Sequence, residues 1–403
     1  MTVRSALGGT ARRATALLPD AAVARIFPRR FSWSPDALST PVAPGTPIRL
    51  FVGPVNSAGQ GYAWARAAER HLEGVGAVDL AIETAGSRKF GYDSDQSVPE
   101  MAFAFANQWR RRQRTALVEG FTHLLLESGR FAYGSVPGST PQRVAAGLVA
   151  DGLTVALVWH GSDIRLPSAH AELEADSPFG ADGGYPAVSV EILERNAAQH
   201  REFARTSGLP SFVSTPGLLD VPGSQWLPVA IDPELWAGGG EPLRRAVPVV
   251  AFAPSNSPMK GSAGIDEELG ALAAAGIIDY RRIASVPWQQ MPSVYRDADI
   301  VLDQFRLGDY GVAACEAMAA GRVVVGHVSE AVRSHVLATT GRELPIVEAR
   351  LDAVADVVRD IARDPDRYRA LSAAGPSFVR EVHDGARSAR ALAPFLGTDI
   401  KEP

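Results

Sequence analysis

The stretch that decides the fold is IVLDQFRLGDYGVAACEAMAAG, residues 300–321. Its first three residues are typical of a short buried strand, and Val312 to Ala320 is predicted to be a helix. The loop between them contains Gly308 and Gly311, where the lack of a side chain lets the backbone approach a ligand. Glu316 lies about one turn into the helix, so its carboxylate can turn back and accept hydrogen bonds from two ribose-type hydroxyl groups. The stretch therefore predicts a strand–loop–helix unit with a ligand site at the loop.

The same alternation of strands and helices runs through the chain from residue 48. The strands predicted in the first half are 48–52, 78–82, 123–126, 154–159 and 211–214, and the helices are 62–72, 102–118, 141–150 and 188–206. The strands predicted in the second half are 249–253, 280–284, 300–302, 323–325 and 345–347, and the helices begin at 263, 291, 312, 351, 365 and 376. Such alternation is typical of parallel sheets covered by helices.

Proline and glycine crowd between residues 228 and 248, which makes this segment the best candidate for an interdomain linker. The sequence thus predicts the α/β class, with two doubly wound, Rossmann-like domains facing each other across a cleft. The predicted parts are a basic N-terminal arm (1–46), a first domain (47–230), a linker (231–248) and a second domain (249–376). In such sheets ligands bind beyond the carboxyl ends of the strands, so the residues after each strand are the candidates for chemistry.

Composition excludes several classes of protein. The chain has 403 residues, 46% hydrophobic and 21% charged, which is typical of a soluble globular protein. Lys and Arg total 40 against 45 Asp and Glu, and the net charge of −5 argues against a dedicated nucleic-acid binder. The single cysteine, Cys315, excludes a disulfide framework and is expected to pack in the core. No metal site is predicted, because no His, Asp and Cys cluster has ligand spacing.

Membrane signals are weak. No apolar run approaches the roughly 18 residues that a spanning helix needs. The first 30 residues contain six arginines, namely Arg4, Arg12, Arg13, Arg25, Arg29 and Arg30. We expect a solvated arm on a cytoplasmic protein; the alternative is a basic segment that contacts the inner face of an anionic membrane or an anionic acceptor.

Three further loops follow predicted strands. Residues 56–61, NSAGQG, are small residues before a helix, which let backbone N–H groups approach an anion; a plain tight turn is the alternative. His160 opens the run HGSDIR at the carboxyl end of a strand, where it can reach a ligand or serve as a structural histidine. Lys260, beside Gly261 at a helix start, suits a diphosphate but can equally be a solvated surface lysine.

As an ordered set, these stretches resemble the retaining GT-B glycosyltransferases of family 4. The resemblance covers about residues 47–395, and the run around Glu316 is its most specific part. The other matching stretches are 253–261, 286–287, 295–299, 303–304 and 310–311 in the second half, and 56–61, 160–163, 214–216 and 226–228 in the first. The resemblance implies the GT-B fold, with a C-terminal helix (377–403) that crosses back onto the first domain.

The resemblance also implies a role for each matching residue. Lys260 would hold the donor diphosphate, Glu316 would bind the ribose, and the backbone near Val286 would meet the base. His160 would lie near the donor sugar and the acceptor, and with Lys260 and Glu316 it forms the expected catalytic set. The remaining expected residues are Gly59, Gly61, Gly308, Asp309, Tyr310 and Gly311 on the donor side, and Asp163, Arg165 and Asp303 on the acceptor side.

The sequence departs from the family pattern at two places. The family has two glutamates separated by seven residues, and the first of them falls on Gly308. The arginine expected five or six residues before the lysine falls on Ser255 or Pro254. Asp309 or Arg306 could compensate, and both alternatives stay open.

The implied reaction moves a sugar from a UDP- or GDP-sugar to an acceptor hydroxyl, with retention of configuration and without a metal or other cofactor. The implied setting is polysaccharide, cell-envelope glycan or glycoconjugate biosynthesis. The expected partners are the nucleotide sugar and a glycan, lipid-linked or small-molecule acceptor, and not nucleic acid. One alternative is a degenerate, non-catalytic subunit that binds a partner transferase, which the two departures favour. The other is a nucleotide-sugar epimerase, which requires carboxylates at the sugar that the sequence does not assign.

Overall fold

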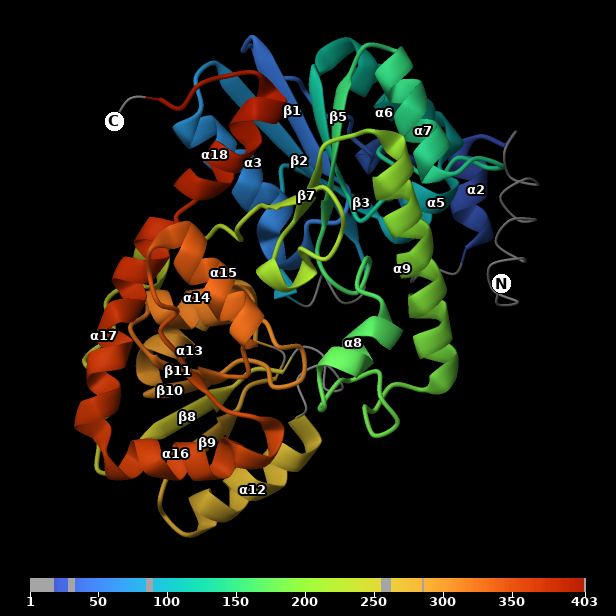
Figure 1. Cartoon of the computed structure of the whole chain (residues 1–403). Helices are drawn as coiled ribbons and strands as arrows, with labels where there is room; N and C mark the ends of the chain where they lie inside the picture. The colour runs from blue at the N-terminus through green and yellow to red at the C-terminus, as the bar shows by residue number, and fades with distance from the viewer. Residues whose placement is uncertain (1–17, 28–32, 85–89, 255–261, 285, 402–403) are drawn as a thin grey trace. The chain divides into compact units, whose positions relative to one another are not determined.

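The computed structural model describes residues 18–27, 33–84, 90–254, 262–284 and 286–401. Over these residues, strands and helices alternate and build two sheets (Figure 1). The predicted α/β class with two helix-covered parallel sheets is therefore confirmed. No helix in these ranges is long and apolar enough to cross a membrane.

The first sheet contains seven strands within the described ranges, in the order β3-β2-β1-β4-β5-β6-β7. Their bounds are β1 Ile48–Gly53, β2 Val75–Glu83, β3 Gln96–Pro99, β4 His123–Glu127, β5 Thr154–Trp159, β6 Ser211–Val213 and β7 Ser224–Trp226. Every pairing with a described register is parallel. The order reverses between β1 and β4, and the loops after these two strands therefore meet where doubly wound sheets bind ligands.

The second sheet contains five strands in the described part of the chain, in the order β12-β11-β10-β8-β9, all parallel. Their bounds are β8 Val249–Phe252, β9 Asp279–Arg282, β10 Ile300–Leu302, β11 Val323–Gly326 and β12 Ile346–Glu348. The three central strands read VVAF, IVL and VVVG and are buried throughout, as expected for a sheet with both faces covered. Here the order reverses between β8 and β10, the strands that precede Lys260 and the loop with Gly308.

Helices cover both faces of the second sheet (Figure 1). One face packs against α13 Met291–Asp297, α14 Val312–Ala319, α15 Glu330–Thr340 and α17 Pro365–Val382, and the other against α12 Ser262–Ala274 and α16 Val354–Arg363. The other helices are α2 Asp20–Ile26, α3 Gln60–His71, α5 Glu100–Phe105, α6 Asn107–Gly120, α7 Pro141–Ala150, α8 Pro167–Leu173, α9 Ala187–Ser207, α10 Pro233–Trp236 and α18 Ala386–Leu396.

The chain divides into two compact units. The first consists of residues 1–160, 202–212 and 389–403, and the second of residues 161–201 and 213–388. The end of the chain is tied to the first unit, since Lys401 N–H donates to the carbonyl of His71 and Ile400 pairs with Leu72. The segment 161–201, called the strap below, packs with the second unit.

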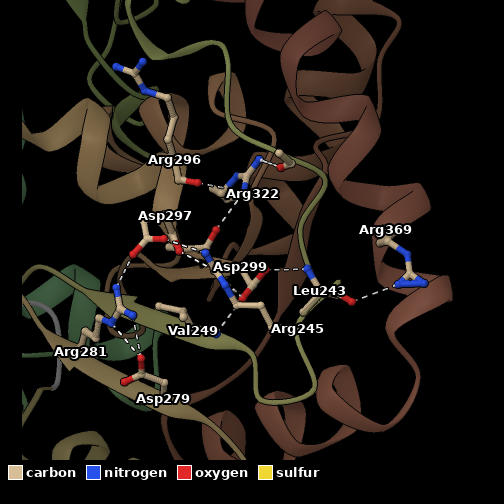
Figure 2. Close-up of polar contacts among 12 residues, drawn as sticks. Leu243, Arg245, Val249, Asp279, Arg281, Arg296, Asp297, Asp299, Arg322 and Arg369 are labelled. Carbon is tan, nitrogen blue, oxygen red and sulfur yellow. Dashed lines mark hydrogen bonds and ion pairs between the residues drawn. The ribbon is translucent and has the colours of Figure 1, made fainter.

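Hydrogen bonds between the predicted linker and the side chains of Asp299 and Arg322 hold this segment on the second unit, at the amino ends of the strands (Figure 2). The Asp299 carboxylate accepts the backbone N–H groups of Leu243 (2.7 Å) and Val249 (2.8 Å) and the guanidinium of Arg245 (3.1 Å). The buried Arg322 donates to the carbonyls of Gly240, Ala298 and Ala320. Residues 240–249 are therefore fixed to the sheet that they precede, although their composition is typical of a linker.

Three predicted helices differ from the structure. The predicted C-terminal helix 377–403 is not one helix, because α17 ends at Val382 and α18 spans only Ala386–Leu396. The predicted helix 102–118 is two helices, because Ala106 is extended (φ −77°, ψ 97°) and α6 starts anew where Asp20 accepts the N–H groups of Gln108 and Trp109. The helix predicted to begin at Pro376 is wrong, because Pro376 lies inside α17. A side chain on the neighbouring Gly375 would overlap the backbone of Met318, so close packing on α14 holds α17 helical through the proline. The sequence analysis missed β3, β7, α8, α10 and α15.

Candidate functional site

The loop after β10 is the best-supported part of the candidate site. Asp303 directly follows β10, is 3% exposed, and accepts the N–H of Gly311 (3.2 Å). The Gln304 amide donates to the carbonyl of Asp309 (2.7 Å), and the Phe305 ring is fully buried against Phe252. These contacts hold the backbone of residues 303–311 in one shape at the carboxyl edge of the second sheet.

Glu316 lies beneath this loop in α14, which begins at Val312 after an extended Gly311. Its side chain is 6% exposed, and the Trp288 indole donates to its carboxylate at 2.8 Å. Val286, two residues before Trp288, packs against the same hydrophobic core. The structure thus pairs Glu316 with an indole that orients its carboxylate, and Val286, predicted to meet the base, lies two residues before that indole.

Asp309 makes its polar contacts within the second unit. It lies 3.7 Å from the Arg165 guanidinium of the strap and accepts the N–H groups of Gly217 (3.2 Å) and Tyr310 (3.0 Å). Burial raises the pKa of Asp309 to about 6, although Arg165 and the hydrogen bonds oppose that shift. Arg306 donates to the carbonyl of Gly183 (3.0 Å). Asp309 and Arg306, the two candidates to replace the missing glutamate, are therefore both held by contacts within the second unit.

Tyr310 is hydrogen-bonded to a buried histidine, His383. Its hydroxyl lies 3.2 Å from Nε2 of His383, and the other ring nitrogen of His383 lies 2.8 Å from the carbonyl of Val229. Burial lowers the pKa of His383 to about 4, so the ring is neutral at pH 7. A neutral ring must donate from Nδ1 to the carbonyl, which leaves Nε2 to accept the Tyr310 hydroxyl.

In the first unit, a buried glutamate organises the loop after β1. One Glu127 oxygen accepts the backbone N–H groups of Val55 (2.7 Å) and Asn56 (2.9 Å), and the other lies 2.9 Å from Nε2 of His160. Glu127 ends β4 and is fully buried. It therefore joins the loops after β1, β4 and β5, which meet at the reversal of the strand order.

Gly59 and Gly61 form part of this loop. Gly59 has φ +76°, where a side chain would be strained and would press on Tyr92. A Cβ on Gly61 would stand 3.3–3.4 Å from Asn56 and Glu127. The His160 ring stacks on Trp64 at 5.5 Å. The structure therefore brings Gly61 and His160 to one carboxylate, while the roles of Gly59, Gly61 and His160 toward a ligand stay predictions.

Lys260 and Ser255 lie outside the described residues. Asp163 accepts the N–H of Gly161 (2.8 Å) and so shapes the start of the strap. Cys315 is buried, as expected.

The sequence analysis missed four polar residues around these loops. They are Glu127, Glu174, Trp288 and His327. Glu127 and His327 each stand at or just after the carboxyl end of a buried strand, a signal that was readable in HLLLE and VVVGH. Glu174 and Trp288 reach the site from the strap and from a short turn, and the sequence carries no equivalent signal for them.

The sequence matches no known family model and no curated protein. The structure, however, is similar to solved glycosyltransferases. Anabaena Alr3699/HepE in complex with UDP-glucose has a TM-score of 0.53 and 11% identity over 86% of this chain and 98% of that one. WaaG, a glycosyltransferase involved in lipopolysaccharide biosynthesis, has a TM-score of 0.51 and 12% identity over 86% and 99%. A glycosyltransferase from Rickettsia africae ESF-5 has a TM-score of 0.50 and 9% identity over 86% and 97%.

At such low identity these likenesses establish the fold and nothing finer. Two parallel α/β sheets of seven and five described strands, matched along almost the full length of those chains, define the GT-B fold. The predicted fold class is confirmed.

Proposed function

We propose that this chain is a retaining glycosyltransferase of the family 4 type, which moves a sugar from a UDP- or GDP-sugar to an acceptor hydroxyl. The observation that carries the proposal is Glu316: a buried carboxylate, oriented by Trp288, one turn inside the helix that follows a glycine-containing loop at the reversal of the strand order. A carboxylate in this position can accept both ribose hydroxyls of a nucleotide. The likeness to a HepE structure that holds UDP-glucose supports the same class of ligand.

The proposed chemistry is a displacement on one face of the sugar. The bond between the anomeric carbon and the diphosphate oxygen breaks, a bond to the acceptor oxygen forms, and the acceptor proton passes to the leaving phosphate. Lys260, with the loops that approach the diphosphate, would stabilise the charge that develops on the leaving group. His160, held by Glu127 and Trp64, would border the donor sugar and the acceptor. The proposal requires neither a metal nor another cofactor.

The setting we propose is glycan or glycoconjugate biosynthesis in the cytoplasm. The acceptor would be a glycan, a lipid-linked sugar or a small molecule, and the basic N-terminal arm would contact the membrane or an anionic acceptor. These finer assignments follow from the resemblance and from the charge of the arm, most of which lies outside the described residues.

The first test is calorimetric binding of UDP, GDP, ADP and dTDP to the full chain in the presence of EDTA. We expect one nucleotide to bind at micromolar concentration, with a loss of at least tenfold in Glu316→Gln and in Lys260→Ala. Glu268→Gln, an exposed glutamate on α12, is the matched control and should bind like the wild type.

Transfer is tested separately, with the sugar nucleotide that binds and a set of acceptor glycans. Proton NMR of the product should show the anomeric configuration of the donor. Binding without turnover on any acceptor would favour the non-catalytic subunit, and conversion of the bound sugar nucleotide into its epimer would favour the epimerase. If no nucleotide binds, the proposed donor site is wrong.

A further inference from the structure

The strap carries one carboxylate to the loop after β10. Glu174 follows α8, is 8% exposed, and lies 2.8 Å from Nε2 of His327, which stands directly after β11. Arg350 lies 3.6 Å from the same Glu174 oxygen and 3.2 Å from Asp176. These contacts fix the Glu174 side chain at the carboxyl edge of the second sheet.

The other oxygen of Glu174 lies directly against Gly308. A Cβ placed on Gly308 would overlap this oxygen and the carboxyl carbon, and Gly308 has φ +63°, where glycine is favoured. The loop that precedes Glu316 therefore lacks a side chain at this point, and a carboxylate from a distant part of the chain occupies the space.

The Glu174 carboxylate is ionised. Burial alone would raise its pKa, but the hydrogen bond from His327 and the charges of His327 and Arg350 outweigh burial and lower the pKa of Glu174 below its ordinary value. The hydrogen bonds that His327 donates to Glu174 and Glu348 raise the pKa of the His327 ring to about 9, so this ring is a cation at pH 7.

An ionised carboxylate held in this way accepts hydrogen bonds and donates none. It repels phosphate, so the diphosphate of a nucleotide sugar does not suit it, whereas a pair of neutral hydroxyl groups does. In the proposed donor complex, the neutral hydroxyl-rich part beside the ribose and the diphosphate is the transferred sugar.

We infer that Glu174 recognises hydroxyl groups of the transferred sugar and is a specificity-determining residue of the donor site, delivered by the strap into the space above Gly308. This inference rests on the proposed function and adds the residue that distinguishes a sugar nucleotide from the nucleotide alone.

The test compares calorimetric Kd values for UDP against UDP-glucose and for GDP against GDP-mannose. In Glu174→Gln, which keeps the shape and removes the charge, we expect nucleotide affinity within twofold of the wild type. The affinity of the sugar nucleotide should fall at least tenfold. Glu172→Gln, an exposed glutamate two residues earlier on α8, is the matched control and should change neither value.

The outcomes separate the two proposals. If Glu174→Gln binds the sugar nucleotide as the wild type does, the inference about Glu174 is overturned while the nucleotide site stands. An equal loss for nucleotide and sugar nucleotide also overturns it, because Glu174 would then support the whole site. If the wild type binds no nucleotide, the proposed function fails and the inference fails with it.

A second measurement tests the placement without any ligand. Gly308→Ala should lower the Tm in the wild-type background by about 3 °C more than in the Glu174→Ala background, because only the wild type has a carboxylate against the new methyl group. Equal losses in both backgrounds would show that Glu174 does not occupy this space.

Discussion

Two buried aspartates stand at opposite ends of the three-residue strand β10, and they do different work. Asp299, at the amino end, is surrounded by two backbone N–H groups and Arg245 and pins the preceding segment to the sheet (Figure 2). Asp303, at the carboxyl end, shapes a loop with two glycines, near which the strap and α14 place further carboxylates. The contacts at the amino edge hold the chain to the sheet, and the carboxyl edge carries the polar groups of the proposed binding site. This is the asymmetry expected of a doubly wound sheet.

The largest expected effect tests the structural role of the amino edge. Asp299→Ala leaves two buried backbone N–H groups and Arg245 without their acceptor, and should lower the free energy of unfolding by about 3–4 kcal/mol, as measured by urea denaturation. The control is Asp297→Ala, whose carboxylate is exposed and pairs with Arg281 and Arg245. Its loss should cost below about 1 kcal/mol. Similar losses for the two variants would contradict the contrast drawn here.

The next prediction concerns pH, which should act on the carboxyl edge and spare the amino edge. The pKa of His327 is raised to about 9 in the folded protein by its bonds to Glu174 and Glu348, against about 6.5 when unfolded. Its contribution to stability is therefore fully present below about pH 6.5 and is lost as the pH rises through 9. It is worth at most about 3 kcal/mol.

The measurement is the difference in unfolding free energy between wild type and His327→Gln at pH 6.5, 7.5 and 9.5. This difference should shrink steadily as the pH rises. The difference between wild type and Asp299→Ala is the reference and should stay constant over the same range. A constant difference for His327→Gln would mean that the ring is neutral in the folded protein.

The first sheet extends this contrast, because its carboxyl edge also depends on one buried carboxylate, Glu127. Glu127→Ala removes the acceptor of the Val55 and Asn56 N–H groups, and should cost about 2 kcal/mol in urea denaturation. Hydrogen exchange at the amides of Val55 and Asn56 should accelerate. Glu119→Ala, on the exposed face of α6, is the control. If exchange at these amides is unchanged, Glu127 does not hold the loop.

These residues also show what the sequence could predict. Apolar runs such as IVL and VVVG predicted the strands, because a strand buried on both faces has no polar positions. Short strands such as β7, which reads SQW, have no such pattern and were missed. Local spacing predicted Glu316 about one turn inside the helix, where the structure has it. It did not predict that Glu127 and His160 share a hydrogen bond across the sheet, since that contact depends on strand order.

The position of Glu174 beside Gly308 could not be predicted from the sequence. The first glutamate of the family pattern falls on Gly308, and the nearby Asp309 and Arg306 are the candidates that the sequence offers to replace it. The structure engages both of these elsewhere and fills the space from residue 174, more than 100 positions earlier in the chain. Charge at a site can be supplied by any segment that the fold brings there, and sequence spacing records only the local segments.

The smallest expected effect tests the carboxyl edge at its most specific contact. Trp288→Phe removes the N–H that orients the Glu316 carboxylate and keeps most of the apolar surface. The affinity for the bound nucleotide should fall three- to tenfold, about 0.7–1.4 kcal/mol, as measured by calorimetry. Trp236→Phe is the matched control, because Trp236 is fully buried against Trp288 and Tyr295. It should cost more stability than Trp288→Phe and leave nucleotide affinity unchanged. If the two variants lose affinity in proportion to their loss of stability, the indole only supports the core. If Trp288→Phe alone loses affinity, orientation of Glu316 is part of binding, and the division between a stabilising edge and a binding edge extends to single hydrogen bonds.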